Sequence, residues 1–364
     1  MFNIIYIYRL IVLERYIPKE AIRLKNNQYQ YLTLLKMNVK RTLHVLLCLP
    51  LYALAAPLVP PAGFTRPLPH TEAGGCVPLP APFTAPLTLR SKYEGSDSAR
   101  ATLNPQAEQA FRAASKPIVG FERGISEMVW RYKQSGDPHT LTCILNGYAA
   151  WAKADALLSG ETSYTGRAMR KWALATLASS WLELKFTPGT PLAGQQATER
   201  WLGKLADRVI QEWDGLPLKS TNNHSYWAAW AVMASAVALD RRDLFNWSLK
   251  EYRIAAGQIA ADGTLANEQR RGARALAYHN YALQPLVMIA SFAGANQIDV
   301  TQENNGALAR LAGYVLQQNG DRLEWLEPWC ALHQCSSGTL SRLVASRPLK
   351  DRRLGGNLTL LYQR

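Results

Sequence analysis

Residues 141–158 read Leu-Thr-Cys-Ile-Leu-Asn-Gly-Tyr-Ala-Ala-Trp-Ala-Lys-Ala-Asp-Ala-Leu-Leu, and this stretch decides the fold class. Its apolar residues recur at helical intervals and alanine is abundant, a pattern that predicts an α-helix. Other stretches of the chain have the same pattern, and Gly, Pro, Asn or Asp separates them. The predicted helices cover 167–185, 196–213, 224–239, 244–259, 274–292 and 305–318.

The rest of the sequence supports an all-α fold. It contains no convincing run of alternating strand residues, no glycine-rich phosphate loop and no repeat of fixed period. About ten or more helices joined by short turns suit antiparallel helix hairpins packed around a common centre. We expect an α/α toroid or barrel, with a plain helical bundle as the alternative.

A second candidate start lies inside the chain at Met37. A short basic end, an apolar run over 42–54 and the residues Ala53-Leu-Ala55 follow it, which is typical of a secretory signal. We therefore expect a signal peptide over 37–55 and export of the remainder. Residues 1–36 are interpreted as upstream sequence included through a wrongly chosen start codon. The alternative, an N-terminal anchor over 4–12, is interrupted by Arg9.

The exported part is expected to be a single domain over 56–364, with a proline-rich, irregular lead-in over 56–87. No stretch of 18 or more uncharged apolar residues predicts a membrane span. Four of the five cysteines remain after the signal peptide is removed, an even number in a compartment that permits disulfides. Cys330 and Cys335 are close enough to pair locally, which leaves Cys76 with Cys143, although the sequence allows three connectivities. A four-cysteine zinc site is the alternative, but no Cys-x-x-Cys spacing supports it.

The net charge indicates the kind of partner. The chain carries +14, and residues 1–55 contain eight Lys or Arg and two Glu, so the exported part keeps about +8. A basic exported protein meets few nucleic acids but many anionic polymers, and its field steers such a chain into a cleft. A contribution to solubility alone is the alternative. Among the many aromatic residues, Trp151, Trp227 and Trp230 are candidates for a groove that binds sugar rings.

The first polar cluster is Lys219-Ser-Thr-Asn-Asn-His-Ser-Tyr-Trp-Ala-Ala-Trp230. Asn222 or Asn223 is a plausible N-cap of the helix that follows. His224 then lies in the first helical turn, where the helix dipole favours the neutral imidazole that a base requires. A capping asparagine and a hydrogen-bonded histidine without catalytic role are the alternative.

The second cluster is Asn267-Glu-Gln-Arg-Arg-Gly-Ala-Arg-Ala-Leu-Ala-Tyr-His-Asn-Tyr281. If the helix begins near Arg271, then Arg271, Arg274, Tyr278 and Tyr281 form one polar stripe. Such a stripe is unusual for a core, and a solvated face is the alternative.

Together these groups suit β-elimination at a uronate. Asn223 and Arg271 can neutralise the carboxylate, His224 or an ionised Tyr278 can remove the C5 proton, and Tyr278 can protonate the departing O4. Glycoside hydrolysis requires two carboxylates across a cleft, and acidic residues are scarce in both clusters. The Gly-x-Ser-x-Gly elbow of serine hydrolases and the His-Glu-x-x-His zinc motif are absent.

Several long stretches of the sequence closely resemble the periplasmic alginate lyases that cut poly(β-D-mannuronate), polysaccharide lyase family 5. The resemblance covers nearly all of the chain from Cys76 onward. The stretches are Asn222-Asn-His-Ser-Tyr-Trp-Ala-Ala-Trp230, Arg241-Arg-Asp-Leu-Phe245, Arg274-Ala-Leu-Ala-Tyr-His-Asn-Tyr-Ala282, Lys92-Tyr-Glu-Gly-Ser-Asp-Ser-Ala-Arg-Ala-Thr-Leu-Asn104 and Trp325-Leu-Glu-Pro-Trp-Cys330.

The resemblance implies an incomplete α/α barrel with a deep cleft. It also implies a periplasmic, endo-acting eliminase that leaves a 4,5-unsaturated uronate and requires no cofactor or metal; a monomer is expected. Asn223, His224 and Arg271 correspond to the carboxylate-neutralising and base group, and Tyr278 to the catalytic tyrosine. The expected sugar contacts are Trp227 and Tyr281, with Lys92 and Tyr93 on a loop that can close over the cleft.

Three questions stay open at the level of sequence. The base is either His224, with Tyr278 as acid only, or Tyr278 itself, because H5 and O4 leave from the same face of mannuronate. The substrate is either polymannuronate or another uronan such as glucuronan. A non-catalytic binder of acidic polysaccharide is a third reading, and the acid–base set argues against it.

Overall fold

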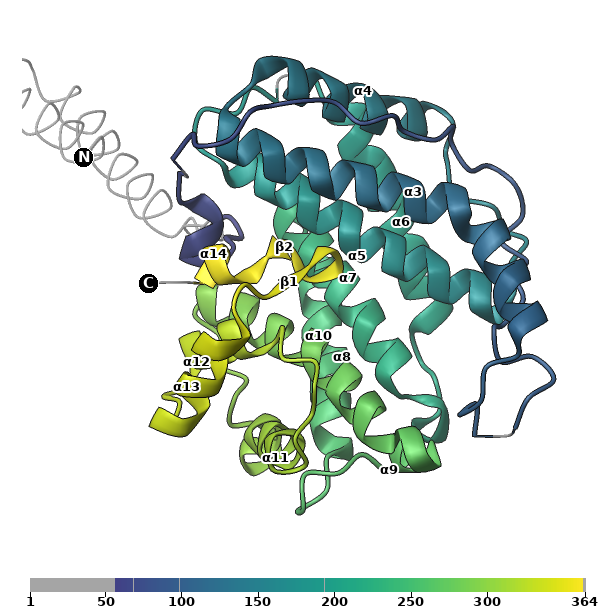
Figure 1. Cartoon of the computed structure of the whole chain (residues 1–364), viewed down its shortest axis with the longest axis vertical. Coiled ribbons are helices and arrows are strands. Elements are labelled where there is room, and N and C mark those ends of the chain that lie inside the picture. Colours follow the sequence, from purple (N-terminus) through teal and green to yellow (C-terminus); the bar gives the residue numbers. More distant parts are fainter. Residues whose placement is uncertain (1–55, 68, 98, 193, 363–364) are drawn as a thin grey trace, which may run out of the picture. The chain divides into compact units, whose positions relative to one another are not determined.

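Helices joined by short turns form most of the fold, as the alternation of apolar stretches and turn residues predicts (Figure 1). The computed structural model describes residues 56–67, 69–97, 99–192 and 194–362. The expected upstream segment 1–36 and signal peptide 37–55 lie outside the described residues. The longer helices are α3 (Pro105–Ser135), α4 (Pro138–Lys153), α5 (Tyr164–Phe186), α6 (Gln196–Trp213), α7 (Asn223–Leu239), α8 (Arg242–Gln258), α10 (Ala275–Ala295) and α11 (Glu303–Gln317).

Short elements fill the turns and the C-terminal part. They are the helices α9 (Ala266–Gln269), α12 (Leu326–Leu332), α13 (Ser337–Ser346) and α14 (Leu358–Tyr362), the 3₁₀ turns η2 (Ala62–Thr65), η3 (Leu218–Ser220), η4 (Gly272–Arg274) and η5 (Arg352–Leu354), and the strands β1 (Lys350–Asp351) and β2 (Gly356–Asn357). The two strands pair antiparallel, with Lys350 opposite Asn357.

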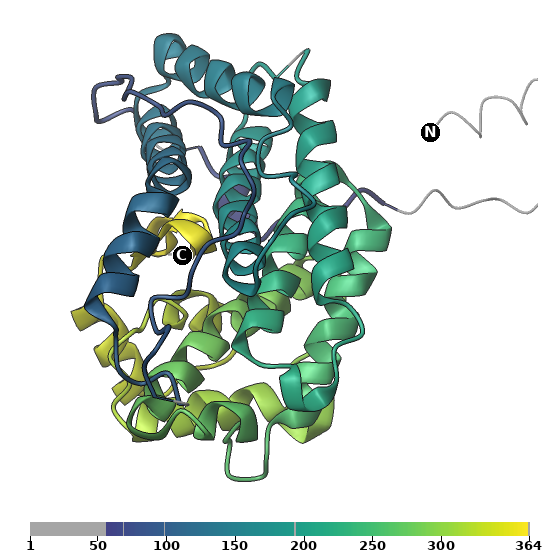
Figure 2. The same ribbon diagram turned by 90° about the vertical axis from the view of Figure 1, so that its right-hand side faces the viewer.

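The helices form two layers. The inner helices α3, α5, α7, α10 and α12 contact one another in that order, and α4, α6, α8 and α11 pack against their outer side. Figure 2 shows the same helices from the side. This arrangement is the incomplete α/α barrel, and the plain bundle is wrong. Of the residues that the structure describes, none belongs to a helix long and apolar enough to cross a membrane.

Helix α7 lies at the centre of the core because its sequence is apolar on every side. Almost every residue from Asn223 to Ala238 is buried. A helix without a polar face needs neighbours all round, and α7 contacts α5, α6, α8 and α10. Only the first turn of α7 differs from this apolar composition, since it carries the polar residues Asn223 and His224, which line the cleft described below.

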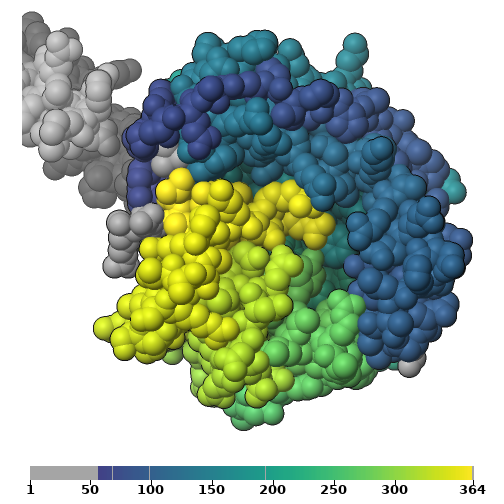
Figure 3. Space-filling model, viewed as in Figure 1, coloured from purple at the N-terminus to yellow at the C-terminus, as the bar shows by residue number. Residues whose placement is uncertain are grey.

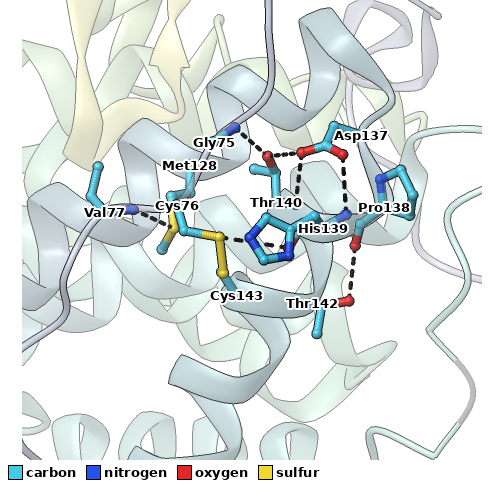
Figure 4. The surroundings of a disulfide bond; sticks show 10 residues. All are labelled: Gly75, Cys76, Val77, Met128, Asp137, Pro138, His139, Thr140, Thr142 and Cys143. Atoms are coloured by element: carbon cyan, nitrogen blue, oxygen red, sulfur yellow. Dashed lines mark hydrogen bonds between the residues drawn. A yellow bond between two sulfur atoms is a disulfide. The ribbon is translucent and has the colours of Figure 1, made fainter.

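The lead-in from residue 57 is irregular apart from η2, and it runs along the outside of the helices (Figures 1 and 2). Cys76 on this segment is bonded to Cys143 of α4, and Cys330 is bonded to Cys335. Both disulfides are the ones expected from the sequence. Figure 4 shows the backbone N–H of Gly75 donating to Thr140 Oγ1 beside the first bridge, at 2.6 Å. His139 lies close to the sulfurs of Cys76 and Cys143. These three residues are the one group of potential metal ligands in the described part of the chain, but the two sulfurs are bonded to each other.

The predicted helix bounds are correct for α6 and differ elsewhere. α4 ends at Lys153 rather than near residue 158, because Asp155 and Leu157 have positive φ angles of 45° and 64°. α11 is regular only after Gly306, since Asn304, Asn305 and Gly306 have left-handed backbone conformations. The longest helix, α3, has no predicted bounds, although Asn104 caps its start and Gly136 ends it at a φ of 64°.

Candidate active site

A cavity of about 560 Å³ opens between the C-terminal segment, the loop that precedes α3 and the first turns of α7 and α10. Figure 3 shows the hollow between the C-terminal residues in yellow and the residues in blue. All eight residues expected to act on or bind sugar line this cavity: Lys92, Tyr93, Asn223, His224, Trp227, Arg271, Tyr278 and Tyr281.

Tyr278 lies between two arginines in the first turn of α10. The guanidinium carbons of Arg271 and Arg274 lie 4.8 and 5.2 Å from the centre of its ring. Burial and the neighbouring Tyr93 raise the pKa of Tyr278 to about 12, against the opposing effect of the arginines. At neutral pH the phenol is therefore protonated and can donate a proton.

Tyr93 belongs to the loop over 91–96 and approaches Tyr278 and Arg274 from the opposite wall of the cavity. Arg274 donates a hydrogen bond to its phenol oxygen. Burial alone would raise the pKa of Tyr93, but the bond from Arg274 and the charge of Lys92 outweigh it and lower the pKa below its usual value. The two phenols interact, and Tyr93 is the one whose ionisation the surroundings favour.

His224 faces the cavity from the first turn of α7, where Asn222 caps the helix by accepting from His224 N–H at 2.9 Å. Its ring stacks on Trp213, with the centroids 5.8 Å apart. Burial, followed by the charges of Lys171 and Arg271, lowers the pKa of His224 well below its usual value. The imidazole is therefore neutral at neutral pH, as the sequence predicts.

Lys171 decides which nitrogen of His224 carries the proton. Its Nζ lies 2.9 Å from His224 Nδ1 and is fully buried. A charged ammonium can only donate, so Nδ1 would accept and Nε2 would keep the hydrogen. A neutral amine can accept from Nδ1–H, which leaves Nε2 free to act as a base. Burial and the charge of Arg353 lower the pKa of Lys171 well below its usual value.

Asn223 is held by the buried carboxylate of Glu268. The Asn223 backbone N–H and side-chain Nδ2 donate to Glu268 Oε1 at 2.7 and 3.0 Å, and Nδ2 also lies 3.1 Å from Oε2. Asn223 Oδ1 is buried without a partner among the described residues. Burial raises the pKa of Glu268. A protonated Glu268 would instead donate to Oδ1 of a turned amide, which directs Nδ2 to the cavity.

Aromatic and cationic side chains form the remaining wall. The rings of Trp227 and Tyr281 stack with centroids 4.9 Å apart, and Trp227 Nε1–H donates to the Tyr281 carbonyl at 3.0 Å. Arg353 lies over the ring of Trp172, 4.8 Å from its centroid, and donates to Tyr281 Oη at 3.3 Å. Planar rings with adjacent cations suit an anionic sugar.

Three expectations about this region are wrong. Trp151 and Trp230 are buried in the core rather than exposed in a groove; their indole N–H groups donate to the carbonyls of Pro80 and Arg353. The stripe from Arg271 to Tyr281 is not a single helix face. Arg271 and Arg274 precede α10, which begins at Ala275, so a 3₁₀ turn brings them around Tyr278.

The sequence reasoning missed several residues of the site. Lys171, which stands between Arg170 and Trp172 where the sequence of α5 becomes apolar, carries a signal that could have been read, since a buried cation needs a partner. Glu268 follows Asn267 in the second cluster. Its role as the partner that holds Asn223 was missed, because acidic residues in the sequence were weighed only as catalytic groups. Arg353 gives no signal, because nothing local relates the C-terminal segment to a cleft formed by helices α5, α7 and α10.

The fold and the cavity define a class of protein: an α/α-barrel protein with a cationic, aromatic-lined cleft for an acidic sugar polymer. The alginate lyase family profile matches residues 88–325. The chain is 50% identical over 337 residues to an alginate lyase of Cobetia marina, covering 85% of this chain and 90% of that protein. An alginate lyase of Pseudomonas fluorescens is also 50% identical, with 85% and 91% covered. The chain belongs to the alginate lyase family.

Solved structures agree with this. Alginate lyase A1-III from Sphingomonas species A1 superposes with a TM-score of 0.68 at 25% identity, covering 83% of this chain and 90% of that chain. A tyrosine-to-phenylalanine variant of A1-III, in complex with a tetrasaccharide, matches with a TM-score of 0.68 at 26% identity, covering 81% and 86%. A histidine-to-alanine variant with a tetrasaccharide matches equally well.

Proposed function

We propose that this alginate lyase cleaves the β-1,4 bonds of polymannuronate from within the chain by β-elimination. The observation that carries the proposal is the position of Tyr278, a protonated phenol between two arginines in the same cavity as a neutral His224. This set combines proton transfer with neutralisation of a carboxylate. The variants of A1-III that were captured with a tetrasaccharide replace a tyrosine and a histidine, the same two residue types.

Neutralisation of the substrate carboxylate comes first. The C5 proton of a uronate is too weakly acidic to be removed while the adjacent carboxylate keeps its full charge. Arg271 Nε has no hydrogen-bond partner among the described residues and lies 3.9 Å from Glu268 Oε2, so the guanidinium is available to the substrate carboxylate when Glu268 is protonated. Asn223 is available beside it when Glu268 is protonated and the amide is turned. Fixed donors around the developing charge stabilise the carbanion-like transition state.

The bonds then change as follows. The base takes the proton from C5, the electrons of the C5–H bond form the C4–C5 double bond, and the C4–O4 bond breaks. Tyr278 gives its proton to O4, which becomes the hydroxyl of the leaving chain. The products are a 4,5-unsaturated uronate at the new non-reducing end and a shortened polymer, with no water consumed.

The base has two candidate assignments, and they differ in the state of Lys171. With a neutral Lys171, Nε2 of His224 is unprotonated and takes the C5 proton. With a charged Lys171, His224 is a hydrogen-bond donor to the carboxylate, and the oxygen of an ionised Tyr278 performs both proton transfers on one face of the mannuronate ring. The low pKa of the buried Lys171 favours the first assignment.

The proposed setting is the periplasm, with export through the signal peptide over 37–55 and clearance of alginate trapped there. The support is the sequence of that segment and the net charge of the exported part, which suits an anionic polymer. No cofactor is part of the proposed reaction.

The test uses the chain from Pro57 onward with polymannuronate, polyguluronate and glucuronan, in the presence of a chelator. The ultraviolet absorbance of the conjugated unsaturated uronate reports elimination. We expect a rise on polymannuronate and little on the other two polymers. A larger rate on glucuronan or polyguluronate would overturn the substrate assignment. No rise on any polymer, from folded protein that binds them, would favour a non-catalytic polysaccharide binder.

Tyr278→Phe and His224→Ala are the matched variants for this assay. Because each removes one proton-transfer group, we expect turnover to fall by about 10²–10⁴-fold while polymer binding stays measurable. Near-normal turnover in either variant would remove that residue from the reaction.

A further inference from the structure

A second hollow lies beside the catalytic cleft, on the other side of a shared wall. It has a volume of about 340 Å³ and is formed by α3 and the C-terminal strands. Its lining residues from α3 are Arg123, Ser126, Glu127 and Trp130, whose spacing places them on one face of that helix. The opposite side consists of Lys350, Arg352, Gly356 and Asn357.

The shared wall is the segment 350–353, which alternates between the two spaces. Asp351 and Arg353 line the catalytic cleft, whereas Lys350 and Arg352 line the second hollow. Figure 1 shows β1 and β2 at the front of the molecule beside α3, and Figure 3 shows the cleft opening on this same face. A polymer that leaves the cleft over this wall therefore meets the hollow.

Trp130 is the unusual residue of the hollow. Nine of the eleven tryptophans are buried, and the two that remain partly exposed are Trp172, in the catalytic cleft, and Trp130. Trp130 is not packed against the hydrophobic core, and its indole N–H has no partner among the described residues. A partly exposed tryptophan whose ring is not held by the core has a ring face available to a ligand.

The charges around Trp130 favour an anion. Arg123 and Lys350 form no ion pair within the part of the chain that the structure describes. Arg352 contacts the buried Glu122, with Nε 3.3 Å from Oε2. Glu127, the acidic residue of the hollow, is paired with Arg131 of the next turn. The charged groups of the hollow that have no ion-pair partner, Arg123 and Lys350, are therefore positive.

We propose that this hollow is a second, non-catalytic binding site for the polyuronate chain. The ring of Trp130 stacks on the apolar face of a sugar residue, and Arg123 and Lys350 pair with carboxylates on either side. The site holds a stretch of polymer outside the cleft, so it acts on long chains and not on short ones. This inference rests on the proposed function for the identity of the polymer.

The kinetic test compares Trp130→Ala/Lys350→Ala with the wild type on long polymannuronate and on a mannuronate tetramer. On the long polymer we expect an apparent KM about tenfold higher and an unchanged kcat, the effect of removing one ring contact and one exposed charge contact. On the tetramer we expect no change in either constant. Lys153→Ala is the matched control, since it removes an exposed cation of α4 that lines neither space.

Two kinetic outcomes would overturn the proposal. If the long polymer and the tetramer are both unaffected, the hollow binds nothing that matters to the reaction. If both are affected equally, the substitutions act on the cleft through the shared wall. Thermal unfolding of the double variant, expected to match the wild type because neither side chain is in the core, checks that the fold is intact.

A binding test separates this proposal from the proposed function. In the Tyr278→Phe background, which is expected not to degrade the ligand, we would titrate polymannuronate and follow binding by calorimetry with and without Trp130→Ala/Lys350→Ala. A weaker affinity in the presence of the two substitutions supports the site even if the wild type cleaves no polymer. Equal affinity overturns the site even if the wild type is an active lyase.

Discussion

At the scale of single residues, the state of His224 determines how the reaction begins. Its pKa lies well below the usual value because of burial and the charges of Lys171 and Arg271. The pKa of Tyr278 is shifted in the opposite direction, since its surroundings raise it to about 12. Two proton-transfer groups whose surroundings move their pKa values apart are an arrangement expected of an acid and a base.

The pH dependence of kcat/KM distinguishes the two candidate bases. If His224 is the base, activity is lost only as the pH falls through its depressed pKa, so the profile is flat around neutral pH. If ionised Tyr278 is the base, activity rises about tenfold per pH unit through the neutral range toward its pKa. Initial rates between about pH 5 and pH 9 are the measurement. A steady rise across this range would eliminate His224 as the base.

Lys171→Met tests the positioning role of the lysine. With a neutral Lys171, the state that goes with His224 as the base, the substitution removes the acceptor of the Nδ1–H hydrogen bond but keeps the length of the side chain. Because that acceptor stabilises the protonated imidazole, we expect the pKa of His224 to fall, so the acid limb of kcat/KM should move to lower pH. A purely structural role for Lys171 would lower the amount of folded enzyme without moving this limb. Thermal unfolding provides that control.

Glu268 is expected to act through Asn223 and not on the substrate. In Glu268→Gln, the new amide can donate to Asn223 Oδ1 and so direct Nδ2 to the cavity. In Glu268→Ala, the side chain of Asn223 loses its partner. We therefore expect Glu268→Gln to keep a kcat within about tenfold of the wild type and Glu268→Ala to lose about 10² or more. Equal losses in the two variants would mean that the carboxylate itself is required.

At the scale of elements, the sequence predicts the helices with a clear apolar period and fails where tertiary contacts decide. The bounds of α6 were predicted because its apolar residues and its flanking Asp214-Gly215 agree. The bounds of α3 were not, since Pro117 and two glycines interrupt its pattern. Cβ atoms at Gly124 and Gly147 would come within 2.5 and 2.4 Å of Leu79, so these glycines let the lead-in pack closely.

The candidate site follows the same division. Residues at the start of α7 and α10 were found because each cluster is continuous in sequence and precedes an apolar helix. Arg353 and Tyr164 come from distant parts of the chain and line the cleft only because the barrel curves, and Lys171 lies buried behind His224. Their contribution depends on the three-dimensional arrangement, which the local sequence does not contain.

The disulfide between the lead-in and α4 is expected to stabilise the fold more than the second disulfide. Cys76 and Cys143 are separated by 67 residues and Cys330 and Cys335 by 5. Since the longer loop restricts the unfolded chain more, Cys76→Ala/Cys143→Ala should lower the free energy of unfolding by about 2–4 kcal/mol. Cys330→Ala/Cys335→Ala is the control and should cost less. Denaturant titration measures both, and a larger loss in the control would contradict the loop argument.

At the scale of the whole molecule, charge and shape act together. The part of the chain after residue 55 carries about +8, and the cleft gathers Lys92, Arg100, Arg271, Arg274 and Arg353 on its walls. A cleft whose wall cations outnumber its carboxylates, here Asp321 and Asp351, concentrates a positive field and attracts a polyanion. The cost of bringing these cations together is reduced by aromatic rings, which lie next to Lys92, Arg271, Arg274 and Arg353.

This field gives a prediction about salt. Because salt at 0.1 M largely screens the attraction between exposed charges that are more than about 10 Å apart, raising the ionic strength should increase the KM for polymannuronate. The kcat should change little, since the groups that transfer protons are half-buried and less screened than charges at the surface. A mannuronate tetramer, which carries fewer charges, should show a weaker dependence of KM on salt than the polymer. Initial rates at several salt concentrations are the measurement. If kcat falls with salt while KM stays constant, the charges act in the chemical step and not in the capture of the polymer.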